Sequence, residues 1–299
     1  LTANTTGSEN TAMGIQAMQA NTTGAVNVGI GTSVLDANTT GDTNTAVGGS
    51  ALGVNTTGDS NTAVGAYALD ANTTASDNTA VGHAALAANT TGTRNTAIGA
   101  TAGDAMTTVS DNTYVGHGAG TANTSGDHNT GIGQASMDEL TTGANNTALG
   151  SNSLSGVVTG DSNTAVGKSA LNANTSGANN VAVGGNALAA NTTATGNIAV
   201  GFNCLDANTT GATNTGVGYY ALSSNTTAGF NTGIGNAALQ TTTEGHSNTA
   251  VGSSALNKVT TGDFNVAVGY NAGLSMTTGD RSVAIGPESL DACTTGQYN

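Results

Sequence analysis

A unit of 17 residues recurs along the whole chain without an insertion or a deletion. Its first position is asparagine at Asn10 and Asn27, and the spacing still holds at Asn299. Residues 10–298 therefore hold 17 complete copies of approximately N-T-A-V-G-x-x-A-L-x-A-N-T-T-G-x-x, with a partial copy at each end. Positions in the unit are numbered 1 to 17 from this asparagine. A period this strict predicts one repeat array over residues 1–299, as a segment of a longer protein.

The composition argues against an ordinary globular domain and against a disordered linker. Aromatic residues are 3% of the chain, tryptophan is absent and 45 residues are glycine, so few large side chains exist to fill a thick core. Position 4 nevertheless holds Met, Ile, Val or Leu in all 17 copies, from Met13 to Ile285. A solvated linker has no reason to keep an aliphatic side chain at one phase of a repeat. The chain is therefore expected to fold.

Each unit contains a short stretch with strand character, such as residues 62–65, and a turn rich in Asn, Thr, Gly and Asp, such as residues 55–60. A short strand that recurs at a fixed period buries its apolar face only when successive copies stack. The pattern predicts an all-β fold: a parallel β-solenoid or β-roll of 17-residue coils in which like residues form columns.

Two positions of the unit are the expected aliphatic core. Position 9 loses its large residue at Gly103, Gly120 and Gly273, and two of these three copies carry Met106 or Met276 at position 12. This exchange predicts that positions 9 and 12 face one core. In three successive coils the expected core residues at positions 4 and 9 are Val47, Val64, Val81, Leu52, Leu69 and Leu86. The other apolar residues at position 12 are Leu140, Val157 and Val259.

Two further positions predict structural roles for the main chain. Position 5 is glycine in all 17 copies, which indicates a corner with positive φ or a close approach of backbones. Position 1 is asparagine in 16 of 17 copies, and Ser282 is the exception. Stacked amides can hydrogen-bond along a column, so position 1 predicts a side-chain ladder. Representative residues of the ladder and of the corner are Asn44, Asn61, Asn78, Gly48, Gly65 and Gly82.

Alanine dominates positions 3, 8 and 11, and position 3 is Ala or Gly in every copy except Tyr114. Smooth stripes of small side chains suit close packing against another chain. The sequence therefore predicts a homo-oligomeric fibre.

Residues 44–48, 180–184 and 282–286 read N-T-A-V-G, N-V-A-V-G and S-V-A-I-G. They resemble the head repeat of trimeric autotransporter adhesins, and similar arrays occur in phage tail fibres and large bacterial surface proteins. The resemblance implies a trimeric β-roll on a bacterial surface or a virion, attached to a host or target glycan or protein through parts outside this chain. The 17-residue unit exceeds the family's usual length, and N-T-T-G replaces its typical second half. A trimer is therefore the default, and a larger ring fits the same stripes.

Several functional classes are not expected. The net charge is −14, and the four basic residues are scattered, so the chain has no surface that would bind nucleic acid. No apolar run is long enough to insert into a membrane. No Ser/His/Asp set or carboxylate pair stands out, so we expect no enzyme. The N-T-T triplets, as at Asn72 and Asn89, match glycosylation acceptors in form, but a structural turn is the better interpretation.

Aspartate recurs at two positions of the unit, in six copies each. Calcium requires several oxygen ligands at one site, so a calcium ion in every coil is excluded, while occasional calcium at turn aspartates stays open. No other cofactor or metal is expected. The aspartates at position 16 are Asp42, Asp59, Asp127, Asp161, Asp263 and Asp280, and those at position 10 are Asp36, Asp70, Asp104, Asp138, Asp206 and Asp291.

These observations predict the structural and adhesive shaft of an extracellular homo-oligomeric fibre. The alternative is the shaft of a phage tail fibre. An ice-binding solenoid is less favoured, because the adjacent threonines of positions 13 and 14 would point to opposite faces of a strand. Aromatic side chains gather toward the C-terminal end and offer either a contact surface for a glycan or protein or ordinary surface variation. They are Tyr219, Tyr220, Phe230, Phe264, Tyr270 and Tyr298.

Overall fold

The computed structural model describes all residues 1–299 and divides them into two compact units, residues 1–146 and 147–299. Each unit is an all-β parallel β-solenoid without a helix. The first unit contains β1 (Thr11–Met13), β2 (Val28–Ile30), β3 (Thr45–Val47), β4 (Thr62–Val64), β5 (Thr79–Val81), β6 (Thr96–Ile98), β7 (Thr113–Val115) and β8 (Thr130–Ile132). The second contains β9 (Thr147–Leu149), β10 (Thr164–Val166), β11 (Val181–Val183), β12 (Ile198–Val200), β13 (Thr215–Val217), β14 (Thr232–Ile234), β15 (Thr249–Val251), β16 (Val266–Val268) and β17 (Val283–Ile285). A single array over residues 1–299 stays a prediction.

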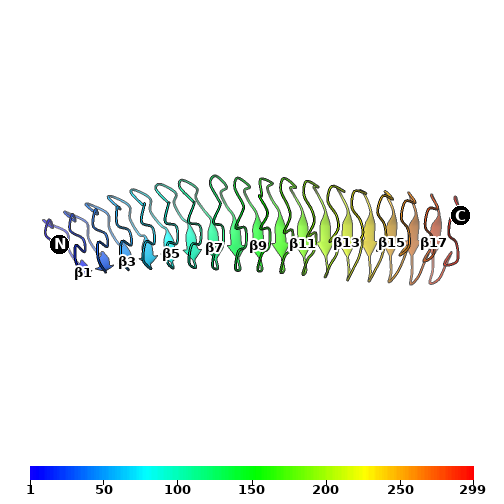
Figure 1. Cartoon of the computed structure of the whole chain (residues 1–299), viewed down its shortest axis with the longest axis horizontal. Helices are drawn as coiled ribbons and strands as arrows, with labels where there is room; N and C mark the ends of the chain where they lie inside the picture. Colours follow the sequence, from blue (N-terminus) through cyan, green and yellow to red (C-terminus); the bar gives the residue numbers. More distant parts are fainter. The chain divides into compact units, whose positions relative to one another are not determined.

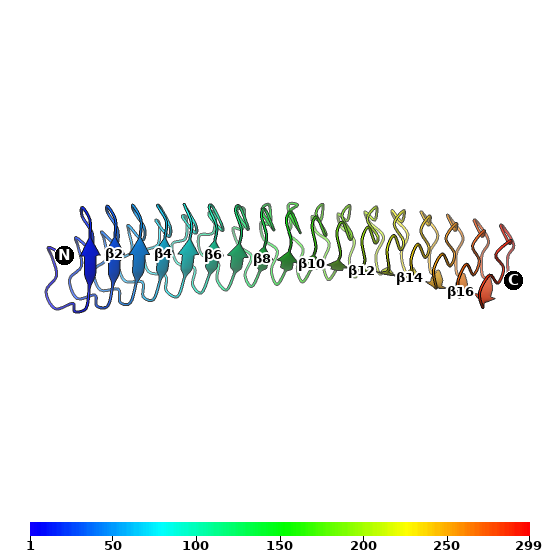
Figure 2. The same ribbon diagram turned by 90° about the horizontal axis from the view of Figure 1, so that it is seen from below.

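Every strand lies at positions 2 to 4 of the repeat and, within each compact unit, pairs in parallel with the strand of a neighbouring coil. In the first unit, Ala63 of β4 lies opposite Ala80 of β5, which is 17 residues further along the chain. In the second, Ala182 of β11 lies opposite Ala199 of β12. Figures 1 and 2 show the arrows of each unit stacked side by side, with a loop that returns from each strand to the next. The predicted fold class, a parallel β-solenoid with like residues in columns, is confirmed.

The interior of each coil is lined by small and medium side chains rather than by the strand valines. Ala63 and Ala68, at positions 3 and 8, are fully buried beside Leu69, whereas Val64 at position 4 is 37% exposed. Successive side chains of a strand point to opposite faces, so a three-residue strand sends its middle residue inward and the other two outward. The expected core role of Val47, Val64 and Val81 is therefore wrong: Val47 and Val81 are only half-buried.

The burial of alanine also corrects the basis of the oligomer prediction. The alanines of positions 3 and 8 are enclosed within their own chain and leave no stripe for a neighbouring copy. Only the alanines of position 11, such as Ala71, remain half-buried. An interface between copies must therefore use another surface.

The leucines of position 9 form the large part of the core, as expected for Leu52, Leu69 and Leu86, which are fully buried. Their backbone conformation was not expected. Leu69 has a φ of 51°, in the left-handed region that costs an ordinary residue about 1–2 kcal/mol. Burial of the side chain offsets this cost, and so do main-chain hydrogen bonds from Leu69 N to Ala85 O (3.0 Å) and from Asn72 N to Leu69 O (3.1 Å).

Each of the three coils that lack a large residue at position 9 is filled by another side chain. Met106 is fully buried, and its sulfur would lie 2.8 Å from a Cβ at Gly103. Met276 is 1% exposed in the coil of Gly273. The third coil is filled by Tyr114 at position 3, whose ring occupies the space a Cβ at Gly120 would need. Positions 9 and 12 thus share one core, and position 3 contributes to it.

Tyr114 is the one large residue at position 3, and its polar end is satisfied inside the core. Its hydroxyl accepts a hydrogen bond from Asn123 Nδ2 at 3.0 Å. Burial raises the pKa of the Tyr114 phenol far above its usual value, so the hydroxyl stays protonated. Gly131, at position 3 of the next coil, leaves room for the ring, because a Cβ there would lie 2.9 Å from it.

One coil departs from the common path by a single residue. Val157, expected in the core at position 12, is 52% exposed, and Val158 is buried instead. The main chain follows the same shift. Thr159 N, at position 14, donates to Thr175 O of the next coil (2.7 Å). In that next coil the equivalent bond is made one position earlier, by Thr175 N at position 13. Val157 is therefore not a core residue, because the slip places its neighbour there.

The core assignment predicts unequal effects for two truncations in one coil. Leu69→Ala should lower the free energy of unfolding by about 2–5 kcal/mol, because it leaves a cavity that neighbouring coils cannot fill. Val64→Ala should cost less than about 1 kcal/mol, because its side chain already contacts solvent. Urea unfolding of the two variants measures both values. A larger loss of unfolding free energy for Val64→Ala than for Leu69→Ala would show that position 4 belongs to the core.

Candidate functional surface

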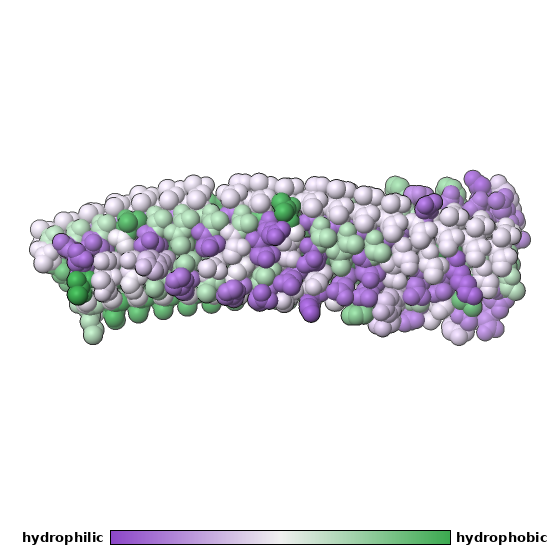
Figure 3. Space-filling model, viewed as in Figure 1, coloured by the Kyte–Doolittle hydropathy of each residue, from purple (hydrophilic) through white to green (hydrophobic).

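The outer face of the strands is the most regular exposed surface of each unit. Position 2 is Thr, Val or Ile and position 4 is aliphatic or Met in all 17 copies, so neither position carries a charge. These side chains point outward, and at position 4 Ile132 is 38% and Ile234 39% exposed. Figure 3 shows a green band along the lower edge of the first unit, where Figure 1 draws its strands. We call positions 2 and 4 together the strand face.

The asparagines of position 1 form a buried ladder behind the strands. Asn61 N and Nδ2 both donate to Asn44 Oδ1, at 3.0 and 3.1 Å, and its Nδ2 also donates to Ala75 O at 2.8 Å. Asn61 Oδ1 accepts from Asn78 N at 3.1 Å. Each amide therefore satisfies main-chain groups of its own coil and of the next one. The ladder expected for Asn44, Asn61 and Asn78 is present.

A second ladder runs through the asparagines of position 12, which the sequence had not indicated. Asn72 Nδ2 donates to Asn55 Oδ1 at 2.9 Å and to Ala75 O at 3.0 Å, and the side chain is fully buried. The same holds at Asn89, so the N-T-T triplets present no exposed amide in the folded coil. The ladder stops where Met106 follows, and Asn89 Oδ1 is left without a partner.

The glycines of position 5 meet both conditions that the sequence indicated. Gly48 has a φ of 130°, a conformation open to glycine alone. A Cβ on Gly48 would lie 2.6 Å from the carbonyl carbon of Gly65. Gly65 and Gly82 have φ values of 135° and 139° and face the next coil in the same way. The corner therefore requires glycine for its torsion and for the contact between coils.

The aspartates of position 16 have a structural role that the sequence reasoning missed. Asp42 Oδ1 accepts from Ala25 N at 2.7 Å, and Asp59 Oδ1 accepts from Asp42 N at 2.8 Å. Ser110 Oγ and His246 Nδ1 accept from the preceding coil in the same way. The sequence signal for this role was the recurrence of short side chains that accept hydrogen bonds at position 16. Calcium at these aspartates stays a prediction.

The threonines of positions 13 and 14 differ in how their hydroxyls are used. Thr39 Oγ1 donates to Thr56 O at 3.0 Å, and Thr56 Oγ1 donates to Thr73 O at 3.0 Å. Position 13 therefore ties neighbouring coils together. Thr57 at position 14 is exposed. The two positions do not form a surface of two equivalent rows of free hydroxyls.

Three aromatic side chains of the second unit form a cluster that we call the aromatic platform: Phe202, Tyr219 and Tyr220. Phe202 and Tyr219 occupy position 6 of adjacent coils, and their rings stack with centroids 5.6 Å apart and an interplanar angle of 16°. Tyr220 stands edge-on to Tyr219 at 4.4 Å. Phe202 is 46% and Tyr219 51% exposed. The stack is ordered and open to solvent.

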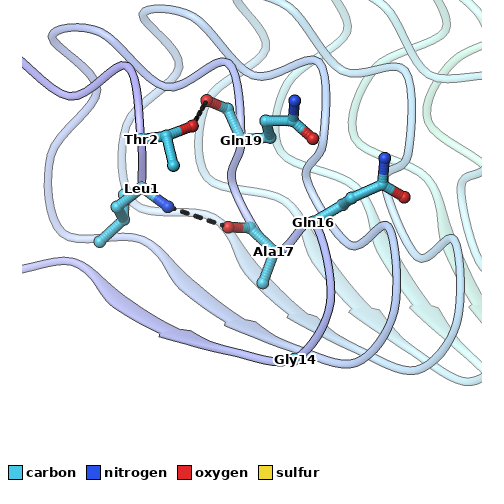
Figure 4. Close-up of a pocket in the computed structure, with 6 residues that line it drawn as sticks. All are labelled: Leu1, Thr2, Gly14, Gln16, Ala17 and Gln19. Atoms are coloured by element: carbon cyan, nitrogen blue, oxygen red, sulfur yellow. Dashed lines mark hydrogen bonds between the residues drawn. The ribbon is translucent and has the colours of Figure 1, made fainter.

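A cavity of about 360 Å³ lies among the first residues of the first unit (Figure 4). Thr2, Gln16 and Gln19 are the polar side chains drawn beside it, and no side chain of its lining is charged. The amino group of Leu1 donates to Ala17 O at 3.3 Å, and Thr2 Oγ1 donates to Gln19 O at 3.4 Å. The cavity thus offers main-chain carbonyls, neutral amides and the Thr2 hydroxyl.

Titratable groups are dispersed along the chain. Nowhere do three His, Cys, Asp or Glu side chains gather closely enough to hold a metal ion. Burial raises the pKa of the Cys204 thiol to about 12, and this side chain fills space left by Gly216 in the next coil. No helix has the length and hydrophobicity to cross a membrane. No protein-family model, curated protein or solved structure matches the chain.

Proposed function

We propose that this chain is the shaft of an extracellular homo-oligomeric fibre that mediates attachment, with three copies as the default and without a catalytic role. The observation that carries the proposal is the strand face. It keeps an uncharged aliphatic column exposed or half-buried along the array, whereas the neighbouring positions 6 and 17 vary freely. An exposed column that never accepts a charge in 17 copies indicates a surface that is covered in the working assembly.

The size of the strand face supports a second copy of the same chain as the cover. A three-residue strand is about 10 Å long and coils are spaced by about 4.8 Å, which gives roughly 400 Å² for each unit. The two units together therefore offer roughly 800 Å² per copy, the amount that stable protein interfaces bury on each partner. Copies of one chain share a 17-residue period, so their faces match coil by coil.

The ladders support a mechanical role. Position 1 joins each coil to the next through buried amides, and position 13 adds a hydroxyl bond on the turn side. A solenoid tied on two sides resists bending and proteolysis, as a shaft on a cell surface or in a phage tail fibre requires. Bacterial and phage fibres share this physical basis, and the proposal covers both.

The test is the mass of the assembly in solution. Sedimentation equilibrium of the chain should give a multiple of 28.6 kDa. Charges of alternating sign on the strand face should return it to one copy, because each charge must be desolvated at the interface. The variant combines Val47→Glu, Val64→Lys, Val81→Glu and Ile98→Lys.

A matched control carries the same charges on the turn side. It combines Thr57→Glu, Thr74→Lys, Thr91→Glu and Thr108→Lys at position 14, which already tolerates Glu244. The control should keep the mass of the unmodified chain, and circular dichroism should show that both variants fold. A mass of one copy for the unmodified chain at tens of micromolar would refute the proposed assembly.

A further inference from the structure

The aromatic platform is the one place in the second unit where large aromatic side chains from adjacent coils meet. Phe202, Tyr219 and Tyr220 form three ring contacts among themselves. In a chain with 3% aromatic residues, such a cluster concentrates apolar surface at a single spot. Phe202 and Tyr219 are each about half exposed, so the stack does not serve the core.

Gly185 leaves one face of the platform open. It occupies position 6 of the coil before Phe202, and a Cβ there would lie 3.3 Å from Phe202 Cδ2. Any side chain at this position would therefore rest on the Phe202 ring. Lys168 is the next residue of the column, two coils and about 10 Å before Phe202. The column thus contains a notch one residue wide, with a ring face as its wall.

Neutral amides border the rings. Asn186 and Asn203 stand at position 7 beside the platform, and Asn186 Nδ2 donates to Asn203 Oδ1 at 3.0 Å. The Nδ2 group of Asn203 makes no hydrogen bond in the structure and is available to a ligand. Asn236 follows Tyr219 in position 6 and is exposed. No charged residue occupies position 6 or 7 in the four successive coils that begin at Asn180, Asn197, Asn214 and Asn231.

We propose that the aromatic platform binds a neutral saccharide, with one sugar ring against the open face of Phe202 in the Gly185 notch. A sugar ring presents C–H groups to an aromatic face and hydroxyls to amides at its rim, which is the chemistry of these residues. The inference gives the chain itself a ligand and so goes beyond the proposed shaft. It does not depend on the number of copies.

Two other classes of ligand fit less well. Three half-exposed aromatic side chains offer roughly 300 Å², well below the roughly 800 Å² that each partner of a stable protein complex buries. A nucleobase also stacks on aromatic rings, but its phosphates would be repelled by a chain of net charge −14. Neither objection applies to a neutral sugar, which is small and carries no charge.

The test is affinity electrophoresis in native gels that contain dextran, mannan, galactomannan, xyloglucan or mixed-linkage β-glucan. We expect at least one of these polysaccharides to retard the chain, and Gly185→Val to weaken the binding at least tenfold by filling the notch. Position 6 accepts a β-branched aliphatic residue at Ile15, so the substitution is compatible with the coil. Phe202→Ala should have the same effect.

The matched control is Gly49→Val, a glycine at the same position of another coil, where a Cβ would meet nothing within 4 Å. It should bind as the unmodified chain does, and so should Tyr67→Ala, which removes an exposed aromatic residue elsewhere. The mass of each variant, measured in parallel, separates loss of sugar binding from loss of assembly. Retardation by none of the polysaccharides, or equal retardation of Gly185→Val and Gly49→Val, would overturn the proposal.

Discussion

Gly48→Ala should destabilise the first unit by about 3–5 kcal/mol. The φ of 130° at Gly48 lies in a region that alanine adopts only with strain. The added Cβ would also lie 2.6 Å from the carbonyl carbon of Gly65 and 2.7 Å from its oxygen. Both atoms belong to the main chain of the next coil, so the clash is relieved only by separating the two coils.

The adjacent residue provides the control. Gly49→Ala adds a methyl group where the φ is ordinary and no atom lies within 4 Å. This variant should be unchanged or more stable by up to about 1 kcal/mol, since alanine restricts the unfolded chain. Urea unfolding compares the two variants. Hydrogen exchange at Gly65 N, which donates to Val47 O at 2.8 Å, reports the local separation of coils. Similar stability of the two variants would contradict the corner geometry.

Asn61→Ala should cost about 3–5 kcal/mol because it leaves Asn78 N without an acceptor, removes one of the two donors to Ala75 O and leaves a cavity. Ala75 O loses the donor at 2.8 Å and Asn78 N loses the acceptor at 3.1 Å, both at a site closed to water. Asn61→Ser should be intermediate. Ser282 shows how a hydroxyl takes over the role: Asn299 N donates to its oxygen at 3.4 Å, and this oxygen donates to Gly296 O at 3.4 Å.

Thermal and urea unfolding of Asn61→Ala, Asn61→Ser and the exposed variant Thr57→Ala measure this order. Thr57→Ala should stay within about 0.5 kcal/mol of the unmodified chain. If Asn61→Ala proved as stable as Thr57→Ala, the position 1 amides would not contribute to the stability of the stacked coils.

The strand and its register could be predicted from the sequence, but the side that faces inward could not. The 17-residue period places Ala63 opposite Ala80 whatever the rest of the coil does. Either set of alternating residues can face the core, and hydrophobicity favoured Val64 over Ala63. The coil is too narrow for that choice, because Leu69 and two asparagine side chains already fill it. The size of the interior, which depends on the whole coil, decides the orientation.

Backbone conformation was the other property that residue types did not reveal. Leucine rarely adopts a left-handed φ, so the sequence did not predict this conformation at Leu69. The glycine at position 5, by contrast, directly predicted a positive φ at Gly48. The packing of Tyr114 was hidden for a related reason. Its partners Gly120 and Gly131 lie six and 17 residues away, and only the stacked coils bring them to one ring. The asparagine ladder of position 1 could be predicted from the sequence because its hydrogen-bonding partners recur in a single column.

The interrupted ladder of position 12 has a consequence for how each unit yields to force. Amide-to-amide bonds join coils without a break from Asn4 to Asn89 in the first unit and from Asn174 to Asn225 in the second. Each run ends at an asparagine whose Oδ1 has no partner. Under tension such joints are the weakest links, so a pulled chain should lengthen in steps of several coils. In the fibre proposed above, each unit would then absorb an applied load in discrete steps.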